Sequence, residues 1–220
     1  AAKLDYKPFE GEVRALGKRL EQNQGDADIA HLKKMIRWSN VCGAVGVATM
    51  WTSGFARLLP ILALSTWTCT RWTMIGHHIC HGGYNRQDDG TGRFTTFGFA
   101  VGSVYRRARD WFDWMLPEAW NVEHNNLHHY RLGESGDPDL VERNLELMRD
   151  IALPRWLKYV AVGGLAGMWK WYYYAPNTYK QLKISQMRKA GIAVSDEEAH
   201  APYTLPVALG DRAEAAKFGT

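Results

Sequence analysis

The sequence predicts a mainly α-helical, membrane-anchored protein, and three observations support that prediction. Two long stretches near the N-terminus carry almost no charge. The chain has ten tryptophans and ten tyrosines, and such rings collect at membrane–water boundaries. Six of the eight histidines lie in two short patches. We therefore expect an N-terminal transmembrane hairpin, a histidine-bearing cap on one membrane face and a third candidate membrane helix.

Composition limits the classes of protein that fit. The net charge is +4 and the basic residues are scattered, so no basic stripe indicates nucleic-acid binding. Three cysteines without paired spacing do not form a secreted disulfide framework. Cys42 and Cys69 lie in apolar runs and are expected to be buried. The mean hydropathy of −0.35 limits the membrane part to a fraction of the chain.

Three regions follow from the order of polar and apolar stretches. Residues 1–35 form a polar lead-in, 36–180 the membrane domain and 181–220 a polar C-terminal tail. In the lead-in we expect a short helix from Glu12 to Leu20. A second helix is expected from Ile29, capped by Asp26 or Asp28. We interpret His31, which has no histidine neighbour, as a surface residue.

The predicted hairpin consists of residues 38–56 and 58–76. The first stretch is uncharged, and as one helix it would be ~28 Å long, close to the hydrocarbon thickness of a bilayer. Trp38 and Trp51 lie near its two ends. The link to the second stretch is short enough to require antiparallel packing. The alternative is a buried helix in the core of a soluble protein.

The two histidine patches lie downstream of this hairpin. GHHICHGGYN holds His77, His78 and His81, and NVEHNNLHHY holds His124, His128 and His129. If the second hairpin helix continues into the first patch, His77 and His81 share one helical face, and the following Gly82 and Gly83 end the helix.

Two further elements complete the chain. Leu140–Ile151 has helical spacing, with Asp137 or Asp139 as its cap. Residues 153–179 form the third apolar stretch, whose uncharged part, Tyr159–Trp169, is short for a membrane span. Snorkelling lysines at its ends would help it to cross or to enter partway.

Clustered imidazoles point to a metal centre, because imidazole binds iron, copper and zinc. Histidines three or four apart on a helix can share one ion, and adjacent histidines such as His128 and His129 can serve two. Glu123 and Asp137 are candidates to hold the second imidazole nitrogen of a ligand. The alternatives are helix caps or surface acids for these two carboxylates, and a polar core of histidine–carboxylate pairs for the patches.

The two patches together resemble the membrane fatty acid desaturase/hydroxylase family over residues 36–180. HHICHGG resembles that family's first histidine box, H-x3-H, at His77 and His81. HNNLHH resembles its second box, H-x3-HH, at His124, His128 and His129, and the following GDPDL is also common in the family.

This resemblance implies a di-iron oxidoreductase that acts on an acyl chain. It implies two iron ions on the five box histidines, with His78 as a further candidate ligand. It also implies a membrane lipid or acyl-carrier substrate, molecular oxygen, and electrons from a ferredoxin or a b-type cytochrome.

The sequence departs from the family at the third box, H/Q-x2-HH, because the only later histidine is His200 in EEAHAP. Three interpretations stay open. The sequence is part of a longer enzyme, a second chain supplies the missing ligands, or the protein is an inactive desaturase-derived subunit of a larger organelle membrane complex. A zinc hydrolase fits less well, because no glutamate lies between His77 and His81.

Localisation follows from the same observations. We expect an integral membrane protein. The chain opens without an initiator Met, and removal of an organelle targeting peptide is one explanation. That explanation indicates the mitochondrial inner membrane or a plastid membrane, with the endoplasmic reticulum as the alternative.

Overall fold

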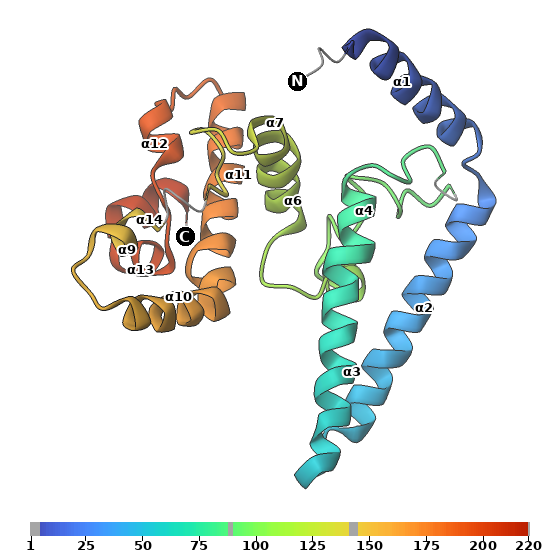
Figure 1. Cartoon of the computed structure of the whole chain (residues 1–220), viewed down its shortest axis with the longest axis horizontal. Helices are drawn as coiled ribbons and strands as arrows, with labels where there is room; N and C mark the ends of the chain where they lie inside the picture. The colour runs from blue at the N-terminus through green and yellow to red at the C-terminus, as the bar shows by residue number, and fades with distance from the viewer. Residues whose placement is uncertain (1–4, 88–89, 141–144, 220) are drawn as a thin grey trace. The chain divides into compact units, whose positions relative to one another are not determined.

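The computed structural model describes residues 5–87, 90–140 and 145–219 and is mainly helical, as predicted (Figure 1). The chain divides into two compact units, Ala1–Gly98 and Phe99–Thr220. The helical elements of the first unit are α1 (Tyr6–Gln22), α2 (Asp26–Thr49), η1 (Gly54–Arg57), α3 (Leu58–Cys69), η2 (Thr70–Gly76) and α4 (His77–Cys80).

Side-chain hydrogen bonds stabilise the starts of the N-terminal helices. The carboxylate of Asp5 accepts a hydrogen bond from the backbone of Lys7 at 3.2 Å at the start of α1. This helix is longer than predicted, since Pro8 is compatible with its first turn. Helix α2 begins at Asp26, three residues before the predicted start, and its N-cap is Gly25 and not Asp26 or Asp28. Asp28, at the third position of the helix, accepts from the backbone N–H of Gly25 at 2.8 Å and stabilises this start.

Helices α2 and α3 lie side by side as an antiparallel pair, which Figure 1 shows clearly. Glycines allow their backbones to approach closely. A Cβ atom at Gly43 would lie 2.9 Å from the ring of Trp67, and one at Gly46 would lie 2.6 Å from Leu64 Cγ. A side chain larger than hydrogen at either position would therefore push the helices apart.

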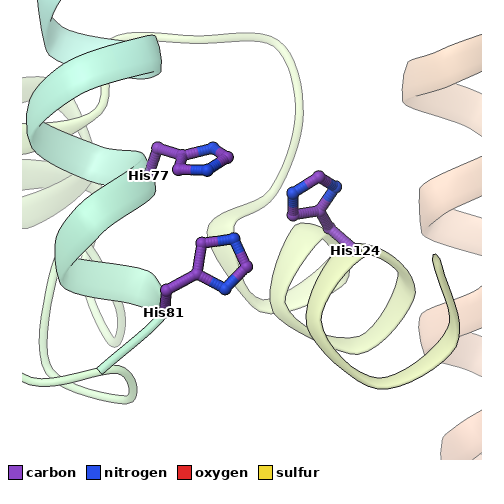
Figure 2. A group of neighbouring side chains, drawn as sticks. All are labelled: His77, His81 and His124. Carbon is purple, nitrogen blue, oxygen red and sulfur yellow. The ribbon is translucent and has the colours of Figure 1, made fainter. Parts of the chain in front are cut away.

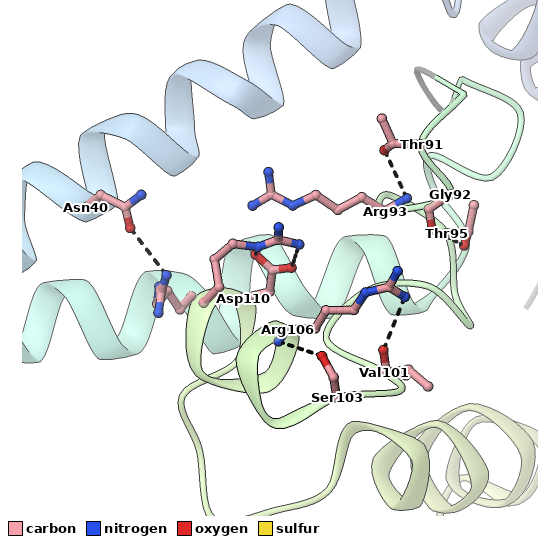
Figure 3. A network of polar contacts seen from close by, with 11 residues as sticks. Asn40, Thr91, Gly92, Arg93, Thr95, Val101, Ser103, Arg106 and Asp110 are labelled. Atoms are coloured by element: carbon pink, nitrogen blue, oxygen red, sulfur yellow. Dashed lines mark hydrogen bonds and ion pairs between the residues drawn. The ribbon is translucent and has the colours of Figure 1, made fainter.

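Polar contacts extend this pairing toward α4. The buried hydroxyls of Ser39 and Thr70 share a hydrogen bond of 2.8 Å. The guanidinium of Arg71 donates to the side-chain oxygen of Asn40 at 3.3 Å (Figure 3) and lies 4.8 Å from the ring centre of Trp67. Arg71 interrupts the apolar stretch in the sequence and is only 8% exposed. The contacts with Asn40 and Trp67 offset the cost of burying its guanidinium charge.

The expectation that this pair spans a membrane is wrong. Among the helices of the described residues, none has both the length and the apolar composition that a bilayer crossing requires. Residues 38–56 do not form one helix, because α2 ends at Thr49. The same finding, that no helix of the described residues can cross a bilayer, also overturns the predicted membrane-face cap and the predicted third membrane helix.

The second unit is also helical. Its elements are α5 (Val104–Asp110), α6 (Pro117–Trp120), η3 (Asn121–His128), α7 (His129–Arg131), α9 (Glu146–Asp150), α10 (Arg155–Trp169), η4 (Lys170–Tyr174), α11 (Ala175–Lys189), α12 (Asp196–His200), α13 (Leu205–Gly210) and α14 (Arg212–Phe218). Of the helix predicted at Leu140–Ile151, residues 141–144 lie outside the described residues, and α9 covers part of the remainder.

Short local contacts set the directions of these helices. Ser103 Oγ accepts from the backbone of Arg106 at 3.2 Å and caps α5 (Figure 3). Helices α10 and α11 run in different directions on either side of the π-helical stretch η4 (Figure 1). A π-helical turn, followed two residues later by Pro176, accounts for the bend.

The residues that the sequence reads as a polar tail form a small core with α11. Ile184, Ala199, Tyr203 and Phe218 are buried together, and the rings of Tyr203 and Phe218 meet edge to face at 5.3 Å.

Lys180 of α11 is 2% exposed and anchors α12 to this core. Its Nζ donates to the carbonyl oxygens of Glu198 at 2.5 Å and Ala201 at 2.6 Å. Gln181 Nε2 donates to Ala199 O at 2.8 Å. One side chain thus satisfies carbonyls at the C-terminal end of α12, where a helix has no internal donors.

We expect Lys180→Met to lower the free energy of unfolding by about 2–4 kcal/mol, because two carbonyls lose a charged donor in a buried site. Urea denaturation followed by circular dichroism measures the change. Lys189→Met, on an exposed position of the same helix, is the matched control and should change stability by less than about 0.5 kcal/mol. Equal stability of the two variants would contradict the anchoring role.

Candidate metal centre

The first histidine patch lies at the end of a continuous helix formed by α3, η2 and α4. His77 and His81 project from the same side of this helix (Figure 2), as their spacing of four predicts. Their ring centres are 4.5 Å apart. His77 is half-buried and His81 is exposed. The helix ends where Gly82 takes a φ of +82°, a left-handed conformation that glycine adopts without strain.

His78 is exposed and its ring centre lies 6.0 Å from that of His77. Together with His81 it lines an open cavity of about 340 Å³, which Asp28 and Tyr84 also line. Burial, followed by the charge of Asp28, raises the pKa of Tyr84. The environment of His78 therefore differs from that of His77.

The second patch lies in the second unit, on a helix with π-helical geometry. The backbone N–H of His129 bonds to the carbonyl of His124, five residues earlier, at the end of η3. This wider turn brings residues five apart onto one side. The Nε2 atoms of His124 and His129 are 3.1 Å apart, and the ring centres of His124 and His128 are 5.1 Å apart.

Asp139 joins two of these histidines. One ligand atom each from His124, His128 and Asp139 lies within 4.8 Å of the others, and all three residues are half-buried. Two imidazoles and a carboxylate form a donor set that first-row divalent metals accept. An ion with bonds of ~2.1 Å to two ligands at right angles holds them about 3.0 Å apart, close to the separation of the two Nε2 atoms above.

Asp137 fixes the orientation of His128. Its Oδ1 lies 2.8 Å from His128 Nδ1, and its carboxylate also accepts from the backbone N–H groups of Gly133 and Asp139 at 2.9 Å each. Burial alone would raise the pKa of Asp137, but these hydrogen bonds, His128 first, lower it. The ionised carboxylate holds the Nδ1 proton of His128, so Nε2 is the nitrogen left for a metal.

Glu123 is fully buried beneath the patch. Burial, followed by the negative charges of Asp139 and Asp137, raises its pKa far above the usual value. Burial also raises the pKa of Asp139, and that of Tyr174, which faces Glu123. Negative charge is thus costly in this site, and a cation would relieve that cost.

Aromatic side chains enclose the patch from the protein side. Trp120, which is 1% exposed, stacks on His124 with ring centres 4.3 Å apart, and its ring meets that of Trp111 edge to face. Tyr173 Oη donates to Pro138 O at 2.6 Å and ties η4 to the loop that carries the two aspartates. Sequence reasoning missed this role of Tyr173, because nothing in the run of three tyrosines distinguishes its buried hydroxyl from those of its neighbours.

The two remaining histidines are not part of the patches. His31 is exposed on α2, as predicted. His200 lines a cavity of about 40 Å³ together with Asn177 and Gln181, and with Leu127 and Pro138 from the region of the second patch. Of the six predicted ligands, the three of the first patch belong to the first unit and the three of the second patch belong to the second unit. Their role as metal ligands stays a prediction.

Comparison with known proteins gives one family. The family model described as "Fatty acid desaturase" matches residues 51–209, a stretch that contains both histidine patches. No curated protein and no solved structure gives a significant match to the chain.

The three cysteines differ in their surroundings. Cys80 lies inside the first patch but is fully buried, and burial raises the pKa of its thiol to about 12. Cys42 is half-buried and Cys69 is exposed, in contrast to the burial expected for both. Because a protonated thiol is a poor metal ligand, Cys80 is a weaker candidate ligand than the neighbouring imidazoles.

In the folded protein, iodoacetamide at pH 8 should alkylate Cys69 and leave Cys80 unmodified, because only the thiolate reacts. Peptide mass spectrometry after brief labelling measures the two sites, and urea-unfolded protein is the control in which both sites react. Labelling of Cys80 at the rate of Cys69 would show that the thiol is accessible and ionisable.

Proposed function

The chain belongs to the fatty acid desaturase family, and we propose that its two histidine boxes hold iron for the oxygen-dependent oxidation of an acyl chain. Family membership supports a desaturase-like oxidoreductase role in lipid metabolism. The family is typically di-iron and membrane-associated.

The observation that carries the proposal is the donor set of the second box. His124, His128 and Asp139 bring ligand atoms together, and Asp137 leaves His128 Nε2 available. His129 Nε2, 3.1 Å from that of His124, adds a further donor. We propose His77 and His81 as ligands from the first box, with His78 as a further candidate. Bound iron would supply the activation of molecular oxygen.

Three residues around the candidate ligands would act on the ligands or on protons near them. Trp120 covers one face of His124 and keeps water from it. Glu123, held protonated at neutral pH, stores a proton directly below the ligands. Asp137 keeps His128 in one tautomer.

We propose a lipid acyl chain or an acyl-carrier ester as the substrate class and a ferredoxin or a b-type cytochrome as the electron donor. As to location, we propose an organelle membrane, mitochondrial or plastid, with the endoplasmic reticulum as the alternative. The substrate class and the electron donor are those that the family resemblance implies, and a membrane location agrees with the membrane association of the family.

A second candidate function is a catalytically inactive, desaturase-derived subunit of a larger organelle membrane complex. The observation in its favour is that His200 is the one histidine of this sequence after the second patch, so the family's third box, H/Q-x2-HH, has no counterpart in it. Family members use more histidines than the six clustered here.

Iron content and turnover distinguish the two functions. We expect the anaerobically loaded protein to bind about two iron ions per chain, and His128→Ala or His77→Ala to bind fewer. Elemental analysis measures iron, and mass spectrometry of an acyl substrate measures oxidation in the presence of oxygen and reduced ferredoxin. His31→Ala is the matched control. Bound iron without product would favour the subunit, and the absence of iron in every preparation would contradict the metal centre.

We expect Asp137→Asn to weaken iron binding by about 10–100-fold, because the neutral amide no longer holds the His128 imidazole in its ligating tautomer. Competition with a coloured chelator measures the affinity. Glu134→Gln, on an exposed position of the same loop, should leave it unchanged. An affinity for iron that is equal in both variants would show that Asp137 acts only as a loop cap.

A further inference from the structure

Helix α1 carries an apolar stripe that has no buried residue. The stripe consists of Tyr6, Phe9, Val13, Leu16 and Leu20, which are 72%, 58%, 51%, 44% and 56% exposed. Their spacings alternate between three and four, which is the a and d pattern of a coiled-coil seam. The remaining positions of the helix are polar, glycine, alanine or proline, so the stripe is narrow and sharply bounded.

The intrinsic stability of helix α1, without a packing partner, is low. A 17-residue helix is marginal in water, and Gly11 and Gly17 lower its helix propensity further. A Cβ atom at either glycine would meet no other atom within 4 Å, so neither is required by close packing. The Glu10–Arg14 ion pair, at 2.7 Å and well exposed, adds little. Burial of the stripe against a partner is the stabilisation that such a helix lacks.

The charges beside the stripe select the kind of partner. With Tyr6, Val13 and Leu20 at a positions, Glu10 occupies an e position, and Asp5, Glu12 and Arg19 occupy g positions. Three acids and one base therefore flank the seam, and the bases Lys7 and Lys18 lie on the opposite face. An anionic lipid surface prefers the reverse order, with a broad apolar face and bases along its edges.

The same charges disfavour a parallel pair with a second copy, in which Glu10 would face Asp5. In one antiparallel register Glu10 would face Glu10 and Glu12 would face Glu12, whereas in the register shifted by one heptad Glu12 would face Arg19. Like charges across the seam destabilise the parallel pair and the first of these antiparallel registers.

We propose that α1 is a docking helix for an amphipathic helix of another polypeptide, whose own a/d seam is flanked by lysine or arginine. The apolar stripe supplies the contact, and Glu10 and Glu12 select a basic partner. This surface is independent of the histidine patches, and its partner can be present whether or not the chain binds iron.

The test uses the full-length protein and two synthetic helical peptides of about three heptads with leucine at a and d. One peptide carries lysine at e and g, and the other glutamate. Fluorescence anisotropy measures their binding. We expect the lysine peptide to bind at least about tenfold more tightly than the glutamate peptide. Glu10→Lys/Glu12→Lys should reverse this preference.

Two matched variants separate the seam from general attraction between charges. Val13→Ser/Leu16→Ser should reduce binding of the lysine peptide by at least about tenfold, because it removes seam side chains. Ala15→Ser/Gln22→Ser, on exposed positions of the opposite face, should bind as the unmodified protein does. Since neither pair is buried, circular dichroism should show the same fold in both variants.

Several outcomes would overturn the proposal. Equal binding of both peptides, or no loss in Val13→Ser/Leu16→Ser, would show that the stripe does not bind a helix selectively. Seam-dependent binding to phosphatidylglycerol vesicles without peptide binding would assign the stripe to a membrane. Seam-dependent dimerisation in sedimentation would assign it to a second copy.

Discussion

One carboxylate organises the second histidine patch. Asp137 accepts hydrogen bonds from the His128 ring and from the backbones of Gly133 and Asp139, so it sets both the direction of an imidazole and the path of the loop that follows. That loop presents Asp139 beside His128. Because a single side chain holds one candidate ligand and positions another, the geometry of the donor set depends on its remaining ionised.

The electrostatics of the patch favour a cation. Burial and neighbouring acids raise the pKa of Glu123 and of Asp139, which means that ionising these two carboxyl groups is costly without a nearby cation. A metal ion would oppose both effects and lower both pKa values. Trp120 and the tethered hydroxyl of Tyr173 maintain the low-polarity surroundings that make this coupling strong.

The sequence predicts local features well and tertiary ones poorly. Helical periodicity correctly puts His77 and His81 on one side of a helix, since that depends on neighbours along the chain. Hydropathy failed for residues 38–56, because charge-free composition does not reveal that the helix ends at Thr49. From the sequence, Asp137 could be either a helix cap or a hydrogen-bond partner of a histidine. Which role it takes depends on how the loop folds back onto the helix, and residue spacing alone does not determine that.

The π-helical geometry of η3 makes the second box sensitive to chain length. In an α-helix, residues five apart differ by about 140° in direction, so His124 and His129 would face different sides. The wider turn brings their Nε2 atoms to 3.1 Å. Inserting one residue between them would place the two histidines six residues apart, about 240° around an α-helix, with every histidine retained but the shared direction lost. Insertions here are therefore constrained more tightly than most substitutions.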